Sequence, residues 1–197
     1  MQSIARNPLL ETKSALRSSL LATREAQGAR ADQDARGEAL ARRLMEAIAR
    51  FPDASCIGFY WPVAGEFDAR DVLTVWLALD ASRRAALPVV VAPRAPLVFH
   101  AWQPSVAMKK GRYGISVPAE ERVVVPDLLV IPCVGFDADR YRLGYGGGYY
   151  DRTLASWPSG LAPATIGVAY ESAKCDALPR AAFDLPLGAI VTESAVY

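Results

Sequence analysis

The sequence reads Asp127-Leu128-Leu129-Val130-Ile131-Pro132 over one continuous apolar run. A run without polar residues at alternate positions is typical of a parallel strand that is buried on both faces of its sheet. A glycine-rich segment follows, and it reads Arg142-Leu143-Gly144-Tyr145-Gly146-Gly147-Gly148-Tyr149-Tyr150-Asp151-Arg152. A helix is predicted from about 149 to 157. This part of the chain is therefore expected to form a strand, a glycine-rich loop and a helix.

The rest of the chain alternates between helical and strand-like segments. Helices are predicted over residues 9–27 and 33–50, and a third helix is predicted to start near Asp68, with one apolar face formed by Val72, Val75, Trp76 and Leu79. Further strands are predicted over residues 56–61, 87–91, 97–102, 164–170 and 189–192. This alternation predicts the α/β class with a mostly parallel sheet. No domain linker is visible, so residues 1–197 are expected to form a single domain.

The composition excludes several classes of protein. The 197 residues include 22 basic and 21 acidic side chains, and this near balance argues against a protein that coats nucleic acid. No apolar run approaches the roughly 18 to 20 residues that cross a bilayer, and no signal-peptide pattern is present. Cys56, Cys133 and Cys175 are far apart and form no CxxC pair, so they are expected to be free thiols. We expect a cytoplasmic protein without nucleic-acid or membrane partners.

The glycine-rich segment has the features of an anion site. Four of the five residues from Gly144 to Gly148 are glycines, so backbone N–H groups can approach a ligand without a Cβ in the way. A helix that starts after the loop would add its positive end, and phosphate is the usual occupant of such a site. Arg142 and Arg152 would add charge. The alternative is a turn used only for tight packing. The segment matches neither GxxxxGK[ST] nor GxGxxG, so these residues alone predict only a phosphate-binding α/β protein.

The chain also resembles a known family. The segment from Leu129 to Leu154, with Phe136-Asp137 and the glycine-rich run, resembles the signature of 5-formyltetrahydrofolate cyclo-ligases. Weaker similarity extends over nearly the whole chain, and it includes Lys13-Ser14-Ala15-Leu16-Arg17 and the segment from Tyr60 to Asp68. The resemblance implies a three-layer α/β/α arrangement like the NagB/RpiA/CoA-transferase-like fold.

The resemblance also implies roles for individual residues. Lys13 and Arg17 would hold the phosphates of ATP, and their spacing of four places both on one side of a helix. The rest of the nucleotide site would be Arg142, Leu143, Gly144, Tyr145, Gly146, Gly147, Gly148, Tyr149 and Tyr150. The folate site would comprise Glu66, Tyr113, Tyr145, Gly146, Gly147 and Tyr149. Arg142 and Tyr150 would be catalytic, and Asp151 would bind Mg²⁺, which proteins hold through one or two carboxylates together with phosphates and water.

Each role has a plainer alternative. The pair of Lys13 and Arg17 could be part of a solvated helix face, and Asp151 could be an ordinary acid in the first turn of a helix. Either Tyr149 or Tyr150 could be core packing. His100, the single histidine, is expected to be structural.

The implied reaction converts 5-formyltetrahydrofolate and ATP to 5,10-methenyltetrahydrofolate, ADP and phosphate. The substrate would be the folate, with or without a polyglutamate tail, and the protein is expected to be a monomer. Three positions depart from the family pattern. Arg140 and Cys133 stand where many relatives have glycine, and Gly188 stands where many have an aspartate that assists magnesium, for which Asp184 is a candidate substitute. The rival functions are a non-catalytic binder of nucleotide or folate and a sugar-phosphate isomerase or transferase on a similar scaffold.

Overall fold

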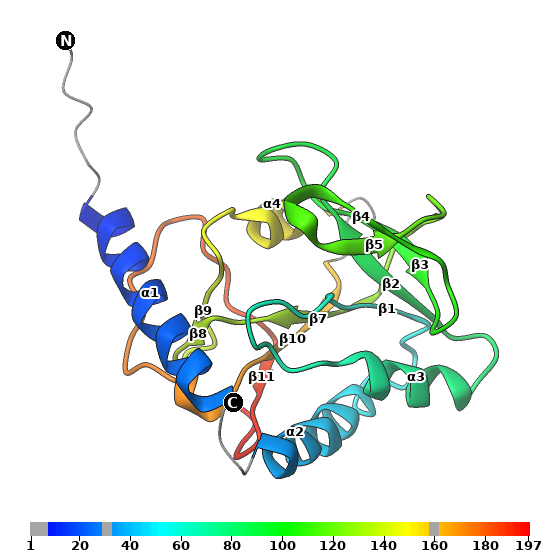
Figure 1. The fold of residues 1–197 in the computed structure, drawn as a ribbon, viewed down its shortest axis with the longest axis horizontal. Coiled ribbons are helices and arrows are strands. Elements are labelled where there is room, and N and C mark those ends of the chain that lie inside the picture. The colour runs from blue at the N-terminus through cyan, green and yellow to red at the C-terminus, as the bar shows by residue number, and fades with distance from the viewer. Residues whose placement is uncertain (1–7, 29–32, 158–161) are drawn as a thin grey trace.

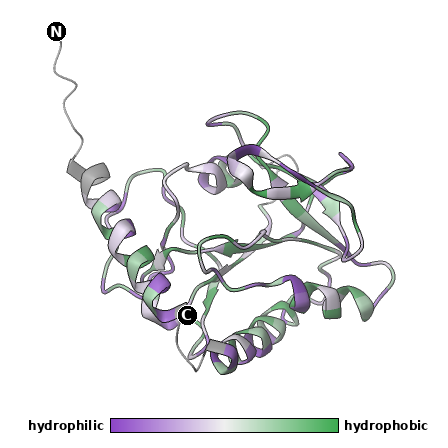
Figure 2. Ribbon diagram, in the orientation of Figure 1, coloured by the Kyte–Doolittle hydropathy of each residue, from purple (hydrophilic) through white to green (hydrophobic). Residues whose placement is uncertain are grey.

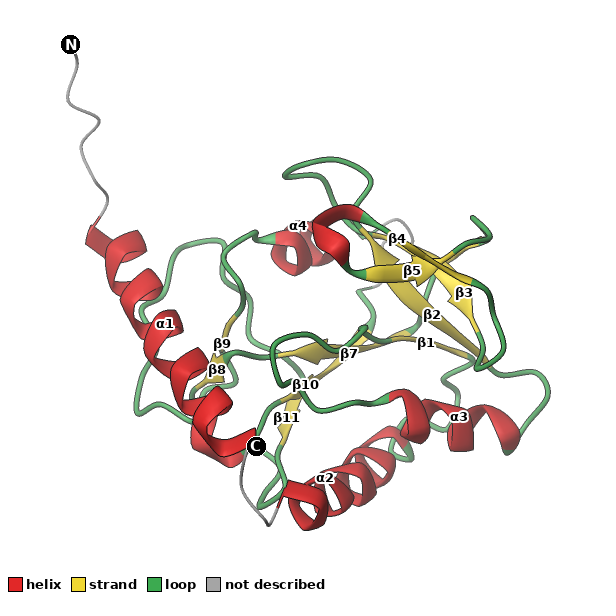
Figure 3. Cartoon of the chain, viewed as in Figure 1, coloured by secondary structure: helices red, strands yellow, loops and turns green. Residues whose placement is uncertain are grey.

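The computed structural model describes residues 8–28, 33–157 and 162–197. Its helices are α1 (Pro8–Gly28), α2 (Gln33–Ile48), α3 (Arg70–Ala78) and α4 (Tyr149–Ala155), with two short 3₁₀ turns at Arg112–Gly114 and Glu171–Ala173. Its strands are β1 (Cys56–Gly58), β2 (Arg84–Val89), β3 (Val98–Trp102), β4 (Met108–Lys110), β5 (Ser116–Pro118), β6 (Val123–Val124), β7 (Leu128–Pro132), β8 (Gly135–Phe136), β9 (Arg142–Leu143), β10 (Ala164–Val168) and β11 (Ala189–Val191). Strands and helices alternate from α2 to β2 and again from β9 to β10, whereas the strands from β2 to β9 follow one another with only the Arg112–Gly114 turn among them (Figure 3).

Within the described residues, seven strands form the central sheet in the order β11-β10-β7-β1-β2-β3-β6. The first five of these strands pair in parallel, whereas β3 and β6 are antiparallel to their neighbours. The chain is therefore an α/β protein with a mixed, mostly parallel sheet. From β1 it continues to the neighbour β2, while from β7 it continues to β10 on the other side. The direction of winding thus reverses between β1 and β7, and ligands in open α/β sheets bind at the carboxyl ends of strands at such a reversal.

The core lies on both faces of this sheet. On one face, α2 and α3 pack Leu40, Leu44 and Leu73 against Ile57 and Val130 of the strands. On the other face, Tyr149, Tyr150 and Leu154 of α4 pack against a cluster that contains Leu129 and Ile131. Leu128, Leu129, Val130 and Ile131 are each fully buried, as predicted for a strand covered on both sides. Figure 1 shows α2 and α3 below the sheet and α4 above it, and in Figure 2 the strands are predominantly hydrophobic.

The predicted face of the third helix is partly wrong. Val72, Leu73 and Trp76 are buried in α3, but Val75 and Leu79 are 56% and 67% exposed. The helix is only nine residues long and ends at Ala78. Such a short helix buries a single narrow stripe of side chains, and this stripe contains Leu73 where Val75 was expected. Asp68 accepts a hydrogen bond from the Arg70 amide at 3.0 Å, although Ala69 is the N-cap residue.

Phe59 and Trp102 are buried and meet edge to face with ring centroids 4.9 Å apart. Two expectations from the sequence are also confirmed. Cys56, Cys133 and Cys175 are free. His100 is 6% exposed in β3, as expected for a structural residue. The proline-rich middle of the chain contains a separate two-stranded sheet of β4 and β5. No described helix combines the length and the hydropathy that a membrane crossing requires.

Candidate active site

The glycine-rich segment begins at the end of a short hairpin beyond β7. β8 and β9 pair so that Gly135 faces Leu143 and Phe136 faces Arg142. The turn between them is shaped by Asp137, which is 1% exposed and whose Oδ1 accepts amide hydrogen bonds from Asp139 and Tyr141, each at 3.1 Å. The hydrogen bonds of Asp137 therefore fix the direction in which the chain enters the glycine-rich segment beyond the carboxyl edge of the sheet.

The backbone of residues 144–148 is available to a ligand. Within the described residues, none of these five amide N–H groups donates a hydrogen bond. Gly146 and Gly148 adopt positive φ values of 91° and 62°, a conformation that L side chains rarely adopt. A Cβ on Gly144 would meet nothing within 4 Å. Unpaired amides at an accessible loop are donors for an anionic ligand.

The predicted cations of α1 lie at this segment. Arg17 Nε donates to the carbonyl oxygen of Gly144 at 2.6 Å, and its guanidinium would lie 3.3 Å from a Cβ on Gly146. No carboxylate of the described residues is paired with Arg17. Lys13 Nζ is 2.5 Å from Oδ2 of Asp184. Arg17 therefore brings a positive charge to the glycines that no carboxylate of the described residues neutralises, while the charge of Lys13 is paired with Asp184.

Arg142 and Asp151 form an ion pair across the two ends of the segment. Arg142 Nη2 is 2.6 Å from Asp151 Oδ1, and the Arg142 side chain is only 5% exposed. Arg142 Nη1 also donates to the carbonyl oxygen of Leu185 at 3.3 Å, next to the Asp184 that binds Lys13. These contacts bring together Arg142 and Asp151, two predicted site residues that flank the glycine-rich loop in the sequence.

Glu66 reaches the same segment from the loop after β1. Its Oε1 accepts a hydrogen bond from the Tyr145 hydroxyl at 2.9 Å, and its Oε2 accepts one from the Val63 amide at 3.0 Å. The Glu66 side chain is 4% exposed. Burial raises the pKa of Glu66 above its ordinary value, and this is opposed by the bonds from Val63 and Tyr145 and by the charge of Arg24.

Tyr113, Tyr149 and Tyr150 provide further polar groups. Tyr113, at φ 59° and 66% exposed, bonds through its hydroxyl to the Tyr149 hydroxyl at 2.7 Å. This contact brings the β4–β5 sheet to the start of α4. The Tyr150 hydroxyl is buried and has no hydrogen-bond partner among the described residues. Burial, followed by the charge of Glu66, raises the pKa of Tyr150, so its hydroxyl keeps its proton. A buried hydroxyl without a partner is costly unless a ligand satisfies it.

Two features of the segment differ from what was predicted for a nucleotide site, namely the side chain of Leu143 and the helix that follows the glycines. Leu143 is buried at 3%, and its carbonyl oxygen accepts from the Val134 amide, so its side chain shapes the hairpin. The helix after the glycines is only seven residues long, and its N-cap is Gly148 in a left-handed conformation. The case for an anion site therefore depends on the loop amides and Arg17 more than on a helix dipole.

The departures from the family pattern have structural explanations. Arg140 has φ 66°, a conformation that glycine adopts freely, and it exchanges hydrogen bonds with Leu187 through its Nε and its carbonyl oxygen. Burial raises the pKa of the Cys133 thiol to about 12, so this thiol is neutral. A Cβ on Gly188 would lie 2.9 Å from the carbonyl oxygen of Thr165. Asp184 Oδ2 is engaged by Lys13 and by the Ala181 amide at 2.6 Å, which limits its use as a metal ligand.

The sequence analysis did not predict one residue of this region, Arg24. Arg24 of α1 is 8% exposed, and it donates to the Tyr145 hydroxyl at 3.2 Å and to the carbonyl oxygen of Cys133 at 2.7 Å. A signal was present, because Arg24 is seven residues after Arg17 and so lies on the same side of the helix two turns later.

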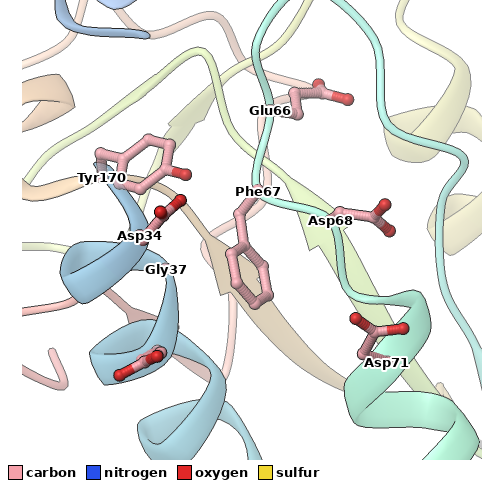
Figure 4. A pocket seen from close by; sticks show the side chains of 8 residues that line it. Asp34, Gly37, Glu66, Phe67, Asp68, Asp71 and Tyr170 are labelled. Atoms are coloured by element: carbon pink, nitrogen blue, oxygen red, sulfur yellow. The ribbon is translucent and has the colours of Figure 1, made fainter. Parts of the chain in front are cut away.

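A separate hollow of about 490 Å³ lies between α2 and the loop that precedes α3. It is lined by Asp34, Gly37, Glu38, Glu66, Phe67, Asp68, Asp71 and Tyr170. In Figure 4 the Glu66 carboxylate points away from Phe67 and Asp34. Four carboxylates other than Glu66 border this hollow, so it would repel a phosphate. The predicted nucleotide site is at the glycine-rich segment instead.

Comparison with known proteins gives consistent matches. The model of the 5-formyltetrahydrofolate cyclo-ligase family matches residues 10–193. The 5-formyltetrahydrofolate cyclo-ligase of Escherichia coli (strain K12) is 33% identical over 151 residues, which is 73% of this chain and 81% of that protein. The 5-formyltetrahydrofolate cyclo-ligase of Haemophilus influenzae is 32% identical over 142 residues, which is 68% of this chain and 73% of that protein.

Two solved structures are also similar. The NMR structure of Aquifex aeolicus 5,10-methenyltetrahydrofolate synthetase superposes with a TM-score of 0.75 at 29% identity, covering 93% of this chain and 91% of the other. The synthetase from Mycoplasma pneumoniae superposes with a TM-score of 0.74 at 27% identity, covering 92% and 98%. The sequence signature, the family model and the shared fold agree, and the chain belongs to the 5-formyltetrahydrofolate cyclo-ligase family of enzymes.

Proposed function

We propose that the protein converts 5-formyltetrahydrofolate to 5,10-methenyltetrahydrofolate with conversion of ATP to ADP and phosphate, as a cyclo-ligase of folate one-carbon metabolism. One observation supports this most strongly. The segment from Gly144 to Gly148 contacts Arg17, a predicted nucleotide residue, on one side and Glu66, a predicted folate residue, on the other. A single loop thus joins the binding groups of two substrates that must react with each other.

For the nucleotide, the chain offers donors and positive charge. The amides of residues 144–148, which have no acceptor among the described residues, and the guanidinium of Arg17 would bind phosphate oxygens. Lys13 is now paired with Asp184, and Arg142 is paired with Asp151. Both cations would also bind the nucleotide if its phosphates replaced these carboxylates as their partners. Arg–phosphate contacts are strong and directional, so these residues would orient the terminal phosphate.

For magnesium, the fit rests on Asp151. The described residues contain no group of three or more His, Cys, Asp or Glu side chains placed to hold a metal. Mg²⁺ does not need such a group, because it commonly takes one or two carboxylates together with substrate phosphates and water. The Asp151 side chain is 24% exposed and lies beside Arg142, just after the glycine-rich loop. A bound Mg²⁺ would neutralise phosphate charge there.

For the folate, Glu66 and the tyrosines supply complementary groups. Glu66 already accepts two hydrogen bonds, and a carboxylate can accept about four. Two acceptor positions thus remain for the N–H donors of a pterin. Tyr113, Tyr145 and Tyr149 are aromatic and partly exposed around the same segment, so they would pack against the rest of the folate.

The chemistry explains why both substrates must meet. The formyl oxygen of 5-formyltetrahydrofolate is a poor leaving group, so N10 cannot displace it directly. In the proposed route this oxygen attacks the γ-phosphorus of ATP, and the bond to ADP breaks. N10 then attacks the activated carbon, loses its proton and expels phosphate, which closes the five-membered ring. The protein would contribute positioning and charge stabilisation. The Tyr150 hydroxyl, which has no partner among the described residues, would donate a hydrogen bond to a reacting oxygen.

A spectrophotometric assay for the methenyl product tests this function. Methenyl absorbance should appear with 5-formyltetrahydrofolate, ATP and Mg²⁺ together and should be absent when ATP is omitted. The second candidate is a binder without turnover, and the lack of an acid at Gly188 favours it. Binding of both ligands by calorimetry without methenyl formation would support the binder and overturn the enzyme. The NagB/RpiA/CoA-transferase-like fold, the single domain and the monomeric state stay predictions.

A further inference from the structure

The proposed function gives no role to Arg24, one of the most buried charged side chains in the described structure. It lies in α1 (Pro8–Gly28) and is 8% exposed. Burying a guanidinium is costly unless it is paired and hydrogen-bonded. Its partners therefore indicate what the chain gains from placing it there.

Arg24 joins three separate parts of the site. One arm, Nη2, donates to the carbonyl oxygen of Cys133 just after β7. The other arm, Nη1, donates to the Tyr145 hydroxyl at 3.2 Å and lies 4.0 Å from Glu66 Oε1. The aliphatic stem packs beside Gly65, because a Cβ there would lie 3.6 Å from both Cγ and Cδ of Arg24.

The Tyr145 hydroxyl completes a closed group with these two residues. It accepts from Arg24 and donates to Glu66 Oε1 at 2.9 Å. A hydroxyl held from both sides has a fixed direction. The group therefore connects α1, the loop after β1 and the glycine-rich segment through one hydrogen-bonded set.

We propose that Arg24 is a positioning residue that holds Glu66 and Tyr145 together. The folate-binding carboxylate of Glu66 and the nucleotide-binding loop that contains Tyr145 thereby keep one fixed relative position. This rests on the proposed function, because it assumes that Glu66 binds the folate. Arg24 itself would touch neither substrate. It acts through Glu66, in the way that residues behind a binding group orient it and tune its charge.

The charges around Glu66 agree with this role. Burial favours the neutral acid, and Arg24 and the two hydrogen bonds favour the carboxylate. Four other ionisable groups interact with Glu66, and all are neutral at ordinary pH because desolvation raises the pKa of each: Tyr60, Cys133, Tyr145 and Tyr150. Arg24 is thus the cation that favours ionised Glu66, and without it the carboxylate would take up a proton at higher pH.

The test uses the purified full chain in the methenyl assay over a range of pH. Arg24→Met keeps the stem beside Gly65 and removes the charge and both hydrogen bonds. We expect KM for 5-formyltetrahydrofolate to rise about 10- to 100-fold, with a much smaller change in KM for ATP. The acid limb of kcat/KM for the folate should move to higher pH. Arg24→Lys restores a charge, so it should return that limb toward the wild-type position.

A double-variant cycle separates positioning from general structural damage. If Arg24 acts through Glu66, adding Arg24→Met to Glu66→Gln should change the folate KM by less than about threefold. Arg36→Met is the matched control, because Arg36 also forms a partly buried ion pair, with Glu193, and its contacts among the described residues do not include the glycine-rich segment. The control should leave KM for the folate and the acid limb at their wild-type values.

The outcomes are distinguishable. A wild-type protein that makes no methenyl product would overturn the proposed function itself. An active wild type whose Arg24→Met variant matches Arg36→Met in folate KM and acid limb would overturn only the role of Arg24. If Arg24→Met does not fold by circular dichroism, Tyr145→Phe examines the same group from its half-exposed side. It should also shift the acid limb upward, and an unmoved limb would overturn the proposal.

Discussion

Arg17 of the first helix donates a hydrogen bond to the carbonyl oxygen of Gly144, across 127 positions of sequence and a distance of 2.6 Å. This contact brings the N-terminal cations to the glycine-rich loop. The loop itself lies beyond β7, at the carboxyl edge of the sheet where the direction of winding reverses. Two elements that are far apart in the sequence therefore meet at the proposed anion site.

Replacement of Arg17 tests the nucleotide half of this site. Arg17→Met removes a guanidinium that has no partner carboxylate among the described residues. KM for ATP should rise about 10- to 100-fold, since a hydrogen bond to a charged group contributes roughly 1.5 to 3 kcal/mol. KM for the folate should change little. Arg43→Met, which removes a bond from α2 to the Glu193 carbonyl, is the control, and an equal effect in both variants would refute the assignment.

Replacement of Asp151 tests the magnesium assignment. Asp151→Asn keeps the shape of the side chain and removes its charge. Half-saturation by Mg²⁺ should shift to roughly 10- to 100-fold higher concentration, while binding of 5-formyltetrahydrofolate by calorimetry persists. Asp68→Asn, at an exposed pair with Arg70, should leave the Mg²⁺ dependence unchanged. Full activity of Asp151→Asn at the wild-type Mg²⁺ requirement would remove Asp151 from the metal site.

Glu66 predicts a pH dependence of folate use. Its pKa is raised above the ordinary 4.5, mainly by burial. The ionised carboxylate accepts more and stronger hydrogen bonds from pterin N–H groups than the neutral acid does. kcat/KM for the folate should therefore fall on the acid side at a higher pH than an ordinary glutamate would give. Glu66→Gln should be less active and should lose this limb. The limb persisting in Glu66→Gln would show that another group is titrating.

The same shift has a consequence for stability. Between 4.5 and the raised pKa, the folded state binds more protons at Glu66 than the unfolded state does, so stability contributed by this group falls as pH rises through that window. Glu66→Gln should be free of this dependence. Urea denaturation of both proteins across the window, compared as a difference, checks the sign.

Tyr150 should separate stability from activity. Its hydroxyl is buried and unpaired within the described residues, so Tyr150→Phe should leave the free energy of unfolding unchanged or raise it by about 1 kcal/mol. kcat should fall about 10- to 100-fold if the hydroxyl binds a reacting oxygen in the transition state. Tyr141→Phe, at a half-buried tyrosine under Arg180, is the control. Loss of stability without loss of kcat would assign Tyr150 to the core.

Much of the fold was predictable because its signals are local. The continuous apolar run at β7 is buried on both faces, and the glycine-rich segment follows it as expected. The prediction for Val75 and Leu79 was wrong, because the spacing of apolar residues does not reveal how short a helix is or which stripe its neighbours cover. Antiparallel pairing of β3 and β6 depends on long-range register, which periodicity does not specify.

The site was predictable as a set of residues, and its connections were not. The family resemblance named Lys13, Arg17, Glu66 and Asp151, but no sequence pattern pairs Lys13 with Asp184 or Glu66 with Tyr145. Arg24 was missed because an arginine on a long helix is usually solvated, and its burial depends on how α1 packs against β8 and the loop after β1. Arg140 carries a positive φ at a position where glycine was the family expectation, which explains why relatives have glycine there; in this chain Arg140 is held by hydrogen bonds with Leu187.

Isotope transfer tests the central claim most directly, namely that the loop brings the γ-phosphoryl group of ATP to the formyl oxygen of the folate. The wild-type protein would be given 5-formyltetrahydrofolate labelled with ¹⁸O in the formyl group, together with ATP and Mg²⁺, and the released phosphate analysed by mass spectrometry. We predict one labelled oxygen in the phosphate for each methenyl product formed. Methenyl product accompanied by unlabelled phosphate would contradict this placement of the two substrates.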